Sequence, residues 1–66
     1  MNRYTLKAML DDTANGSYIH ADTNEDAMMQ AIGYIMDRAM NSELWAKGLI
    51  ELRDIEGRLV AEMGAK

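Results

Sequence analysis

The chain has 66 residues, a formal net charge of -4, seven methionines, and neither cysteine nor proline. This composition excludes disulfides and cysteine-based zinc sites, and one histidine cannot build a histidine cluster. A domain this small buries only about 60% of its unfolded surface, so its stability is marginal. Without disulfides or a metal, the chain is stabilised by its core alone, by self-association or by a partner. The negative charge argues against direct binding of nucleic acid, because phosphates recruit cationic side chains.

The first segment offers no membrane or export signal. No apolar run approaches the about 20 residues that a membrane span requires. The opening "MNRYTLKAML" lacks the long apolar region and cleavage site of a signal peptide. We therefore expect a complete, single-domain gene product over residues 1–66 that is cytoplasmic and does not contact a membrane, in keeping with the absence of cysteine.

Two strands are predicted at the start of the chain. "RYTLKAML" alternates, with Tyr4, Leu6 and Ala8 on one face, which is the two-residue period of a strand. "DDTANG" has the residue types of a loop, including Gly16 for a positive φ. "SYIHA" is a second short strand. The prediction is a hairpin with a longer loop.

A helix is predicted over "DTNEDAMMQAIGYIMDRAMN". Thr23 or Asn24 can cap it, and Thr23 with Asp26 resembles a capping box. Successive residues lie about 100° apart on a helix, so one stripe is expected to face the core. That stripe contains Met28, Ile32, Ile35 and Ala39, flanked by Ala31.

Met29, Met36 and Met40 lie together on one shoulder of this helix. Methionine packs adaptably and recurs at promiscuous binding surfaces, so the shoulder has two interpretations: filling of a small core, or an interface. Gly33 lies on the outer side of the helix, where close approach by another chain is one reason for a glycine.

The end of the chain predicts a hairpin. "SELWAKG" ends the helix or adds a short turn, with Trp45 covering one end of the core. In "IELRDIEGRLVAEM", Asp54 to Gly57 suit a type I turn closed by a left-handed glycine, flanked by an Asp54–Arg58 charge pair. The expected register places Leu52 opposite Val60. Leu49, Leu59, Ala61 and Met63 are then expected on the face away from Leu52.

These elements predict an α+β domain with a four-stranded antiparallel sheet and one helix packed on one face, in the order ββαββ. The order of the strands in the sheet stays open. Nucleophilic catalysis requires a base beside the nucleophile. Ser17 and His20 point to opposite faces of a regular strand, so His20 cannot activate Ser17. We therefore expect no enzymatic activity. "DDTANGSYIHAD" partly matches a calcium loop, but a hairpin explains the same residues, so no metal or cofactor is expected.

The acidic residues gather in a stretch without lysine or arginine. One interpretation is a solvated loop and a helix N-terminus, where acids are favourable. The other is a surface for a basic partner. The stretch contains Asp11, Asp12, Asp22, Glu25 and Asp26.

Three resemblances add to this interpretation. "ADTNEDAMMQAIGYIMDRAM" resembles the strand-to-helix passage of HicB-like antitoxin domains over about a third of the chain. The layout, with "IELRDIEGRLVAEM", is similar to a family of small bacterial proteins of unknown function that have two strands, a helix and a closing hairpin. In size, charge and lack of catalytic motifs, the chain resembles anti-CRISPR proteins of phages and mobile elements. That resemblance implies an inhibitor that docks on a Cas protein.

Our hypothesis is a protein-binding module, in its most concrete form a small acidic inhibitor of the anti-CRISPR type that binds a Cas or other nucleic-acid-binding protein. The five acids would meet basic residues of the partner, and Met29, Met36 and Met40 would supply apolar contact. The alternative is a homodimeric structural or antitoxin-like domain that buries Leu49, Leu59 and Met63.

Overall fold

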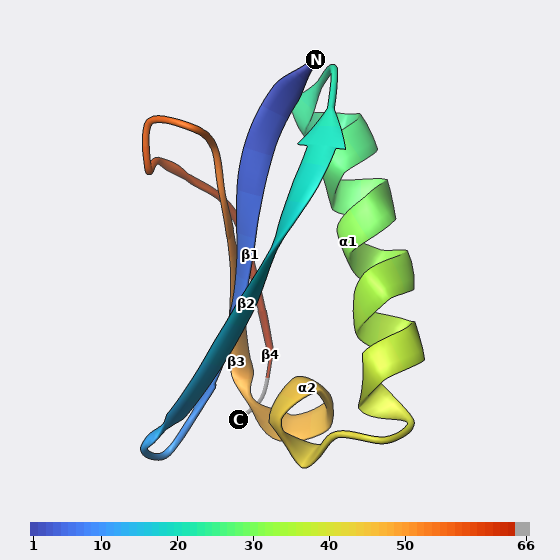
Figure 1. Ribbon diagram of the computed structural model, residues 1–66, viewed down its shortest axis with the longest axis vertical. Helices are drawn as coiled ribbons and strands as arrows, with labels where there is room; N and C mark the ends of the chain where they lie inside the picture. Colours follow the sequence, from blue (N-terminus) through green and yellow to red (C-terminus); the bar gives the residue numbers. More distant parts are fainter. Residues whose placement is uncertain (65–66) are drawn as a thin grey trace.

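The computed structural model describes residues 1–64 and contains one sheet and two helices (Figure 1). The elements in chain order are β1 (Asn2–Leu10), β2 (Thr13–Ala21), α1 (Asn24–Ala39), α2 (Glu43–Lys47), β3 (Leu49–Arg53) and β4 (Leu59–Gly64).

The sheet is four-stranded and antiparallel, with the strand order β2-β1-β3-β4. The long helix α1 lies along one face of the sheet, and α2 closes the lower end of the space between them (Figure 1). The predicted α+β class and the ββαββ order are therefore confirmed, with α2 as an added short helix. We call the face turned away from α1 the outer face of the sheet.

The core lies between α1 and the sheet, and the strands supply most of its volume. Leu6 and Leu52 are the largest side chains with no exposed surface. The helix α1 contributes the small side chains of Ala27 and Ala31, while Trp45 of α2 closes one end. The full set of buried apolar residues is Tyr4, Leu6, Ala8, Ile19, Ala21, Ala27, Ala31, Trp45, Ile50 and Leu52.

The side of α1 that faces the core agrees with the expected one only in part. The predicted stripe included Ile32, but the side chain of Ile32 is 50% exposed. Met28 and Ile35 are partly buried beside the core. The buried side of α1 is rotated toward Ala27 and Ala31 relative to the predicted stripe. The strands fill the space between the sheet and α1 with large side chains, so the helix contacts the sheet through small ones.

The first hairpin turns earlier than predicted. Thr13 pairs with Leu10, so Thr13 to Gly16 belong to β2 and are not a loop. Asp11 takes the positive φ, at 54°, a conformation that Asp tolerates better than most residues. The predicted positive φ at Gly16 was therefore wrong. Thr13, Asn15 and Gly16 of the calcium-loop pattern lie on the extended strand β2, and Asp11 and Asp22 lie outside its two ends.

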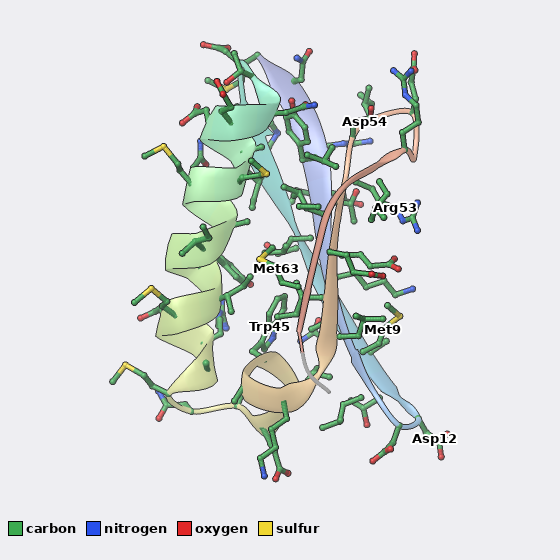
Figure 2. The ribbon with its side chains drawn as sticks, turned by 180° about the vertical axis from the view of Figure 1, so that it is seen from behind. Met9, Asp12, Trp45, Arg53, Asp54 and Met63 are labelled. Carbon is green, nitrogen blue, oxygen red and sulfur yellow. The ribbon has the colours of Figure 1, made fainter. Side chains whose placement is uncertain are left out.

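The turn of the second hairpin is confirmed, but its register is not. Gly57 has φ of +84°, and its N–H donates to the carbonyl of Asp54 at 2.9 Å. Leu52 pairs with Ala61 and Arg53 with Leu59, so Val60 is an extra residue in a β-bulge. The bulge turns Met63 toward the helix, contrary to the prediction (Figure 2).

The link between α1 and β3 is a capped helix. The hydroxyl of Ser42 accepts a hydrogen bond from the N–H of Trp45 at 3.5 Å, which caps the start of α2. The Tyr34 and Trp45 rings meet edge to face, with centroids 5.2 Å apart. Gly48 follows in a place where an added Cβ would collide with the carbonyls of Leu44 and Met9. The predicted role of Trp45, to cover one end of the core, is confirmed.

Candidate protein-binding surfaces

The side of α1 opposite the core carries large apolar side chains in solvent. Their exposed fractions are 72% for Met29, 50% for Ile32, 66% for Met36 and 81% for Met40. We call these four residues the Met stripe. In Figure 2, sulfur atoms mark the side of α1 that faces away from the sheet. The three methionines named from the sequence are thus on the surface, and filling of the core does not account for them.

Helical geometry explains why the stripe is exposed. At 3.6 residues per turn, Met29, Met36 and Met40 point away from the direction of the buried Ala27 and Ala31. Gly33 lies among them, and an added Cβ there would meet no atom within 4 Å. Nothing in the described fold therefore requires a glycine at this position.

The five acids named from the sequence do not form one patch. Asp11 and Asp12 occupy the tip of the β1–β2 hairpin, which projects from the lower end of the molecule (Figures 1 and 2). Asp22, Glu25 and Asp26 lie at the opposite end, where β2 leads into α1. A strand rises about 3.3 Å per residue, so the length of β2 separates the groups by about 30 Å.

The acids at the start of α1 are partly explained by the fold. The hydroxyl of Thr23 caps the helix by accepting from the N–H of Asp26 at 3.1 Å. The amide of Gln30 donates to the Asp26 carboxylate at 3.4 Å. Glu25 and Asp26 lie in the first turn and favour the positive end of the helix dipole. Glu25 and Asp26 also lie one turn before Met29, so the N-terminal end of the Met stripe is acidic.

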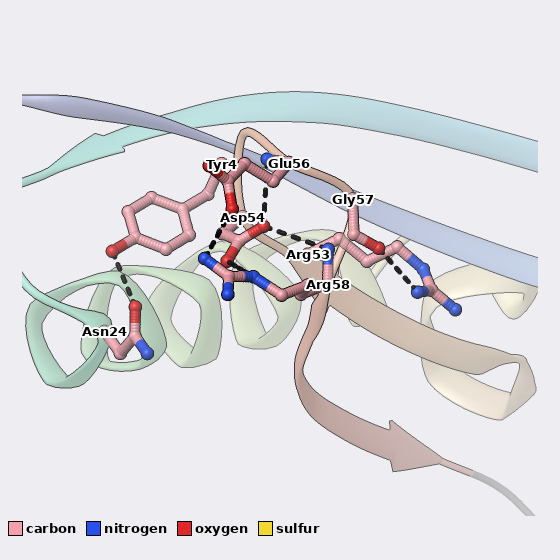
Figure 3. A network of polar contacts seen from close by, with 7 residues as sticks. All are labelled: Tyr4, Asn24, Arg53, Asp54, Glu56, Gly57 and Arg58. Carbon is pink, nitrogen blue, oxygen red and sulfur yellow. Dashed lines mark hydrogen bonds and ion pairs between the residues drawn. The ribbon is translucent and has the colours of Figure 1, made fainter.

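A polar network surrounds the β3–β4 turn (Figure 3). The Asp54 carboxylate accepts from the backbone N–H groups of Glu56 and Arg58, each at 2.9 Å, and from the Arg58 guanidinium at 3.2 Å. The backbone N–H of Arg58 is the largest cause that lowers the pKa of the Asp54 carboxyl below its ordinary value, and partial desolvation opposes it. The predicted Asp54–Arg58 pair is confirmed. All the N–H groups that donate to the Asp54 carboxylate here belong to Glu56 and Arg58 of the same turn.

This turn also borders a pocket of about 280 Å³ between the starts of β1 and α1. The hydroxyl of the buried Tyr4 donates to Asn24 Oδ1 at 2.8 Å beside it (Figure 3). The contact joins residues far apart in the sequence, and no local pattern predicts it. The Tyr4–Asn24 bond joins β1 to α1, whereas the bonds of Asp54, Glu56 and Arg58 stay within the turn.

The histidine and metal hypotheses can be placed on the fold. His20 is exposed on the outer face, while Ser17 is on the helix-facing side of β2, as the alternation predicted. Asp11 and Asp22 of the calcium template lie at opposite ends of β2. Within residues 1–64, no three acidic or histidine side chains lie close enough together to hold a metal ion.

The outer edge of β2 is a feature that the sequence analysis did not identify. β2 has only β1 as a neighbour in the sheet, so its other side is an edge. Two of its backbone groups bond to side chains: Gly16 N–H donates to Asn15 Oδ1 at 2.8 Å, and the His20 carbonyl accepts from Gln30 at 3.0 Å. The edge follows from the strand order, which no local pattern in the sequence predicts.

Comparison of the sequence with protein-family models, with curated proteins and with solved structures found no match. The resemblances to HicB-like and anti-CRISPR proteins therefore stay predictions. Neither helix of the described part of the chain is both long and apolar enough to cross a membrane.

Proposed function

We propose that this chain is a non-enzymatic protein-binding module that docks on its partner through the Met stripe of α1. The observation that carries the proposal is the exposure of Met29, Ile32, Met36 and Met40 on one side of a helix whose opposite side forms the core. Contiguous apolar surface of this kind marks interaction sites, because water does not solvate it favourably. The absence of cysteine favours a cytoplasmic setting.

The arrangement fits a helix that enters an apolar groove of a partner. Anchors in this binding mode recur along one side of a helix, as Met29, Ile32, Met36 and Met40 do. Unbranched methionine side chains adapt to the shape of the groove. Gly33, which leaves space beside the stripe, allows the partner to approach the helix backbone closely.

Charge indicates the kind of groove. Glu25 and Asp26 lie at the N-terminal end of the stripe, and Asp37 lies on α1 near its other end. A groove bordered by lysine or arginine would complement them. Proteins that bind nucleic acid have such surfaces, so an anti-CRISPR-type inhibitor of a Cas or other nucleic-acid-binding protein is the most concrete form of this proposal.

The test is capture of partners from a lysate that expresses nuclease-based defence systems, with wild type and two variants. Met29→Gln with Met36→Gln removes apolar contact from α1 but keeps side-chain length and helix propensity. Leu59→Gln is the matched control, because Leu59 is 49% exposed on the outer face of the sheet. We expect wild type and the control to retain one stoichiometric partner and the α1 variant to lose it. Equal capture by the α1 variant would refute the proposal.

A self-associating domain is the second candidate, and one observation favours it. The outer face of the sheet is not covered by any element of residues 1–64, and Leu49 and Leu59 are exposed on it. Met63, which the sequence analysis placed there, faces the helix instead. Sedimentation at high micromolar concentration tests this candidate: dimers that Leu59→Gln dissociates would support it, and a monomer would exclude it.

A further inference from the structure

The two edges of the sheet are built differently. β2 pairs with β1 at all nine of its residues without irregularity, and its sequence TANGSYIHA has no lysine, arginine, acid or proline. β4 is the other edge, and it is shorter, with a bulge and the charged Glu62. Bulges, charges and short length are the devices that keep an edge strand from pairing with another chain. β4 has these devices and β2 does not.

The backbone of β2 shows which groups face this edge. In an antiparallel ladder, the N–H and C=O of alternate residues point to the same side. The N–H of Gly16 donates to the side chain of Asn15, and the carbonyl of His20 accepts from the side chain of Gln30, so neither group bonds to β1. Ala14 and Tyr18 share their parity, so their N–H and C=O also face outward, and in the described structure no side chain bonds to these groups.

We propose that the edge of β2 is a docking site for an extended segment of a partner protein, which joins the sheet as a fifth strand and is neutral at its centre and basic at both ends. Backbone hydrogen bonds supply affinity in this mode, and alternate side chains supply specificity. The Ala14 and Tyr18 backbone groups would bond to the segment. This site is separate from the Met stripe and does not depend on it.

The choice of occupant follows from charge. Asp11 and Asp12 lie before β2, and Asp22 follows it, so acids lie at both ends of an uncharged strand. A segment with lysine or arginine at both ends complements this pattern. A second copy of the chain does not, because antiparallel pairing of two β2 strands would bring Asp11 and Asp12 of one copy beside Asp22 of the other.

The test uses a synthetic peptide of about ten residues with paired lysines at both ends of a neutral Thr/Val centre, which matches the length of β2. Binding is followed by fluorescence anisotropy and by amide hydrogen exchange of the full chain. We expect the amides of Ala14 and Tyr18 to become protected, and those of β4 to stay unchanged. Protection on β4, or binding without protection on β2, would overturn the proposal.

Two sets of variants sharpen the test. Ala14→Pro removes an edge N–H where proline is tolerated, and we expect about fivefold weaker binding from one lost hydrogen bond. Ile55→Pro is the control, because proline is favoured at the second position of a type I turn.

Asp12→Lys and Asp22→Lys should each weaken binding about two- to fivefold, in the range of an exposed ion pair. Equal binding of a peptide with glutamate ends would refute the charge pattern.

The test separates this site from the proposed function. Met29→Gln with Met36→Gln should leave the affinity for the lysine-ended peptide unchanged. If the peptide does not bind while the Met stripe still captures a partner, the β2 site is refuted and the proposed function stands. Dimers of the free chain that Ala14→Pro dissociates would show that a second copy occupies the edge, which would overturn the proposed occupant.

Discussion

Glu51 and Glu62 lie directly opposite each other on β3 and β4, on the outer face of the sheet. Arg53 forms an ion pair with Glu51 at 3.2 Å, and its guanidinium also donates to the carbonyl of Gly57 at 2.8 Å. Like charges opposite each other in a sheet are destabilising. The carboxylates of Glu51 and Glu62 therefore repel each other between β3 and β4. The ion pair with Arg53 offsets this repulsion at Glu51 only.

The first prediction removes this repulsion. Glu62→Lys should raise the free energy of unfolding by about 0.2–1 kcal/mol, because lysine forms an opposite-charge pair with Glu51. Urea unfolding measures the change. Asp12→Lys at the tip of the β1–β2 hairpin is the control, since it changes net charge equally but has no cross-strand acid opposite it. Equal stabilisation by both variants would assign the effect to net charge.

The second prediction tests the register of the β3–β4 hairpin. Because Met63 packs on the core and Leu59 is exposed on the outer face, Met63→Ala should cost more than Leu59→Ala. We expect about 1–2 kcal/mol for the partly buried Met63 and about 0.5 kcal/mol or less for Leu59. Chemical denaturation of both variants provides the comparison. The reverse order would show that the bulge at Val60 is absent in solution.

The third prediction compares two glycines. Gly33→Ala should stabilise the chain by about 0.5–1 kcal/mol, because an added Cβ in α1 is unobstructed and restricts the unfolded chain. Gly57→Ala should destabilise it by about 1–2 kcal/mol, because φ of +84° is unfavourable for a residue with a Cβ. If a partner approaches α1 closely, Gly33→Ala should also weaken binding despite the gain in stability. Thermal unfolding and capture of the partner report the two effects separately.

The fourth prediction concerns acid. The pKa of Asp54 is lowered in the folded state, chiefly by the Arg58 N–H, so its ionised form stabilises the fold above the unfolded pKa of about 3.9. This contribution is lost as the pH falls through the folded pKa. Asp54→Asn should therefore lower the thermal midpoint at neutral pH, and the gap to wild type should close under acid. A gap that does not narrow as the pH falls would contradict the linkage.

Several local signals in the sequence were accurate, although the loop and the positive φ expected at Gly16 were not. The Asp54 to Gly57 turn, the Arg58 pair and the Thr23 cap depend on residues within one or two turns of each other, and all are confirmed. The class and order of the elements are also confirmed, because alternation and helical periodicity are properties of each segment.

Features set by tertiary packing could not be predicted in the same way. The helix has two apolar sides, and the sequence does not say which one the sheet selects; the core uses Ala27 and Ala31. The bulge at Val60 moves the register by one residue without any glycine to mark it. The separation of the acids and the open edge of β2 became visible only with the strand order.

The core's use of alanines on α1 has a consequence for which substitutions the fold tolerates. The large side chains of Met29, Ile32, Met36 and Met40 hold little of the fold together, so their replacement alters the surface with a small effect on folding. We therefore expect the fold to tolerate substitutions on this side of the helix. The scaffold that presents it, fixed by Leu6, Leu52 and Trp45, stays the same.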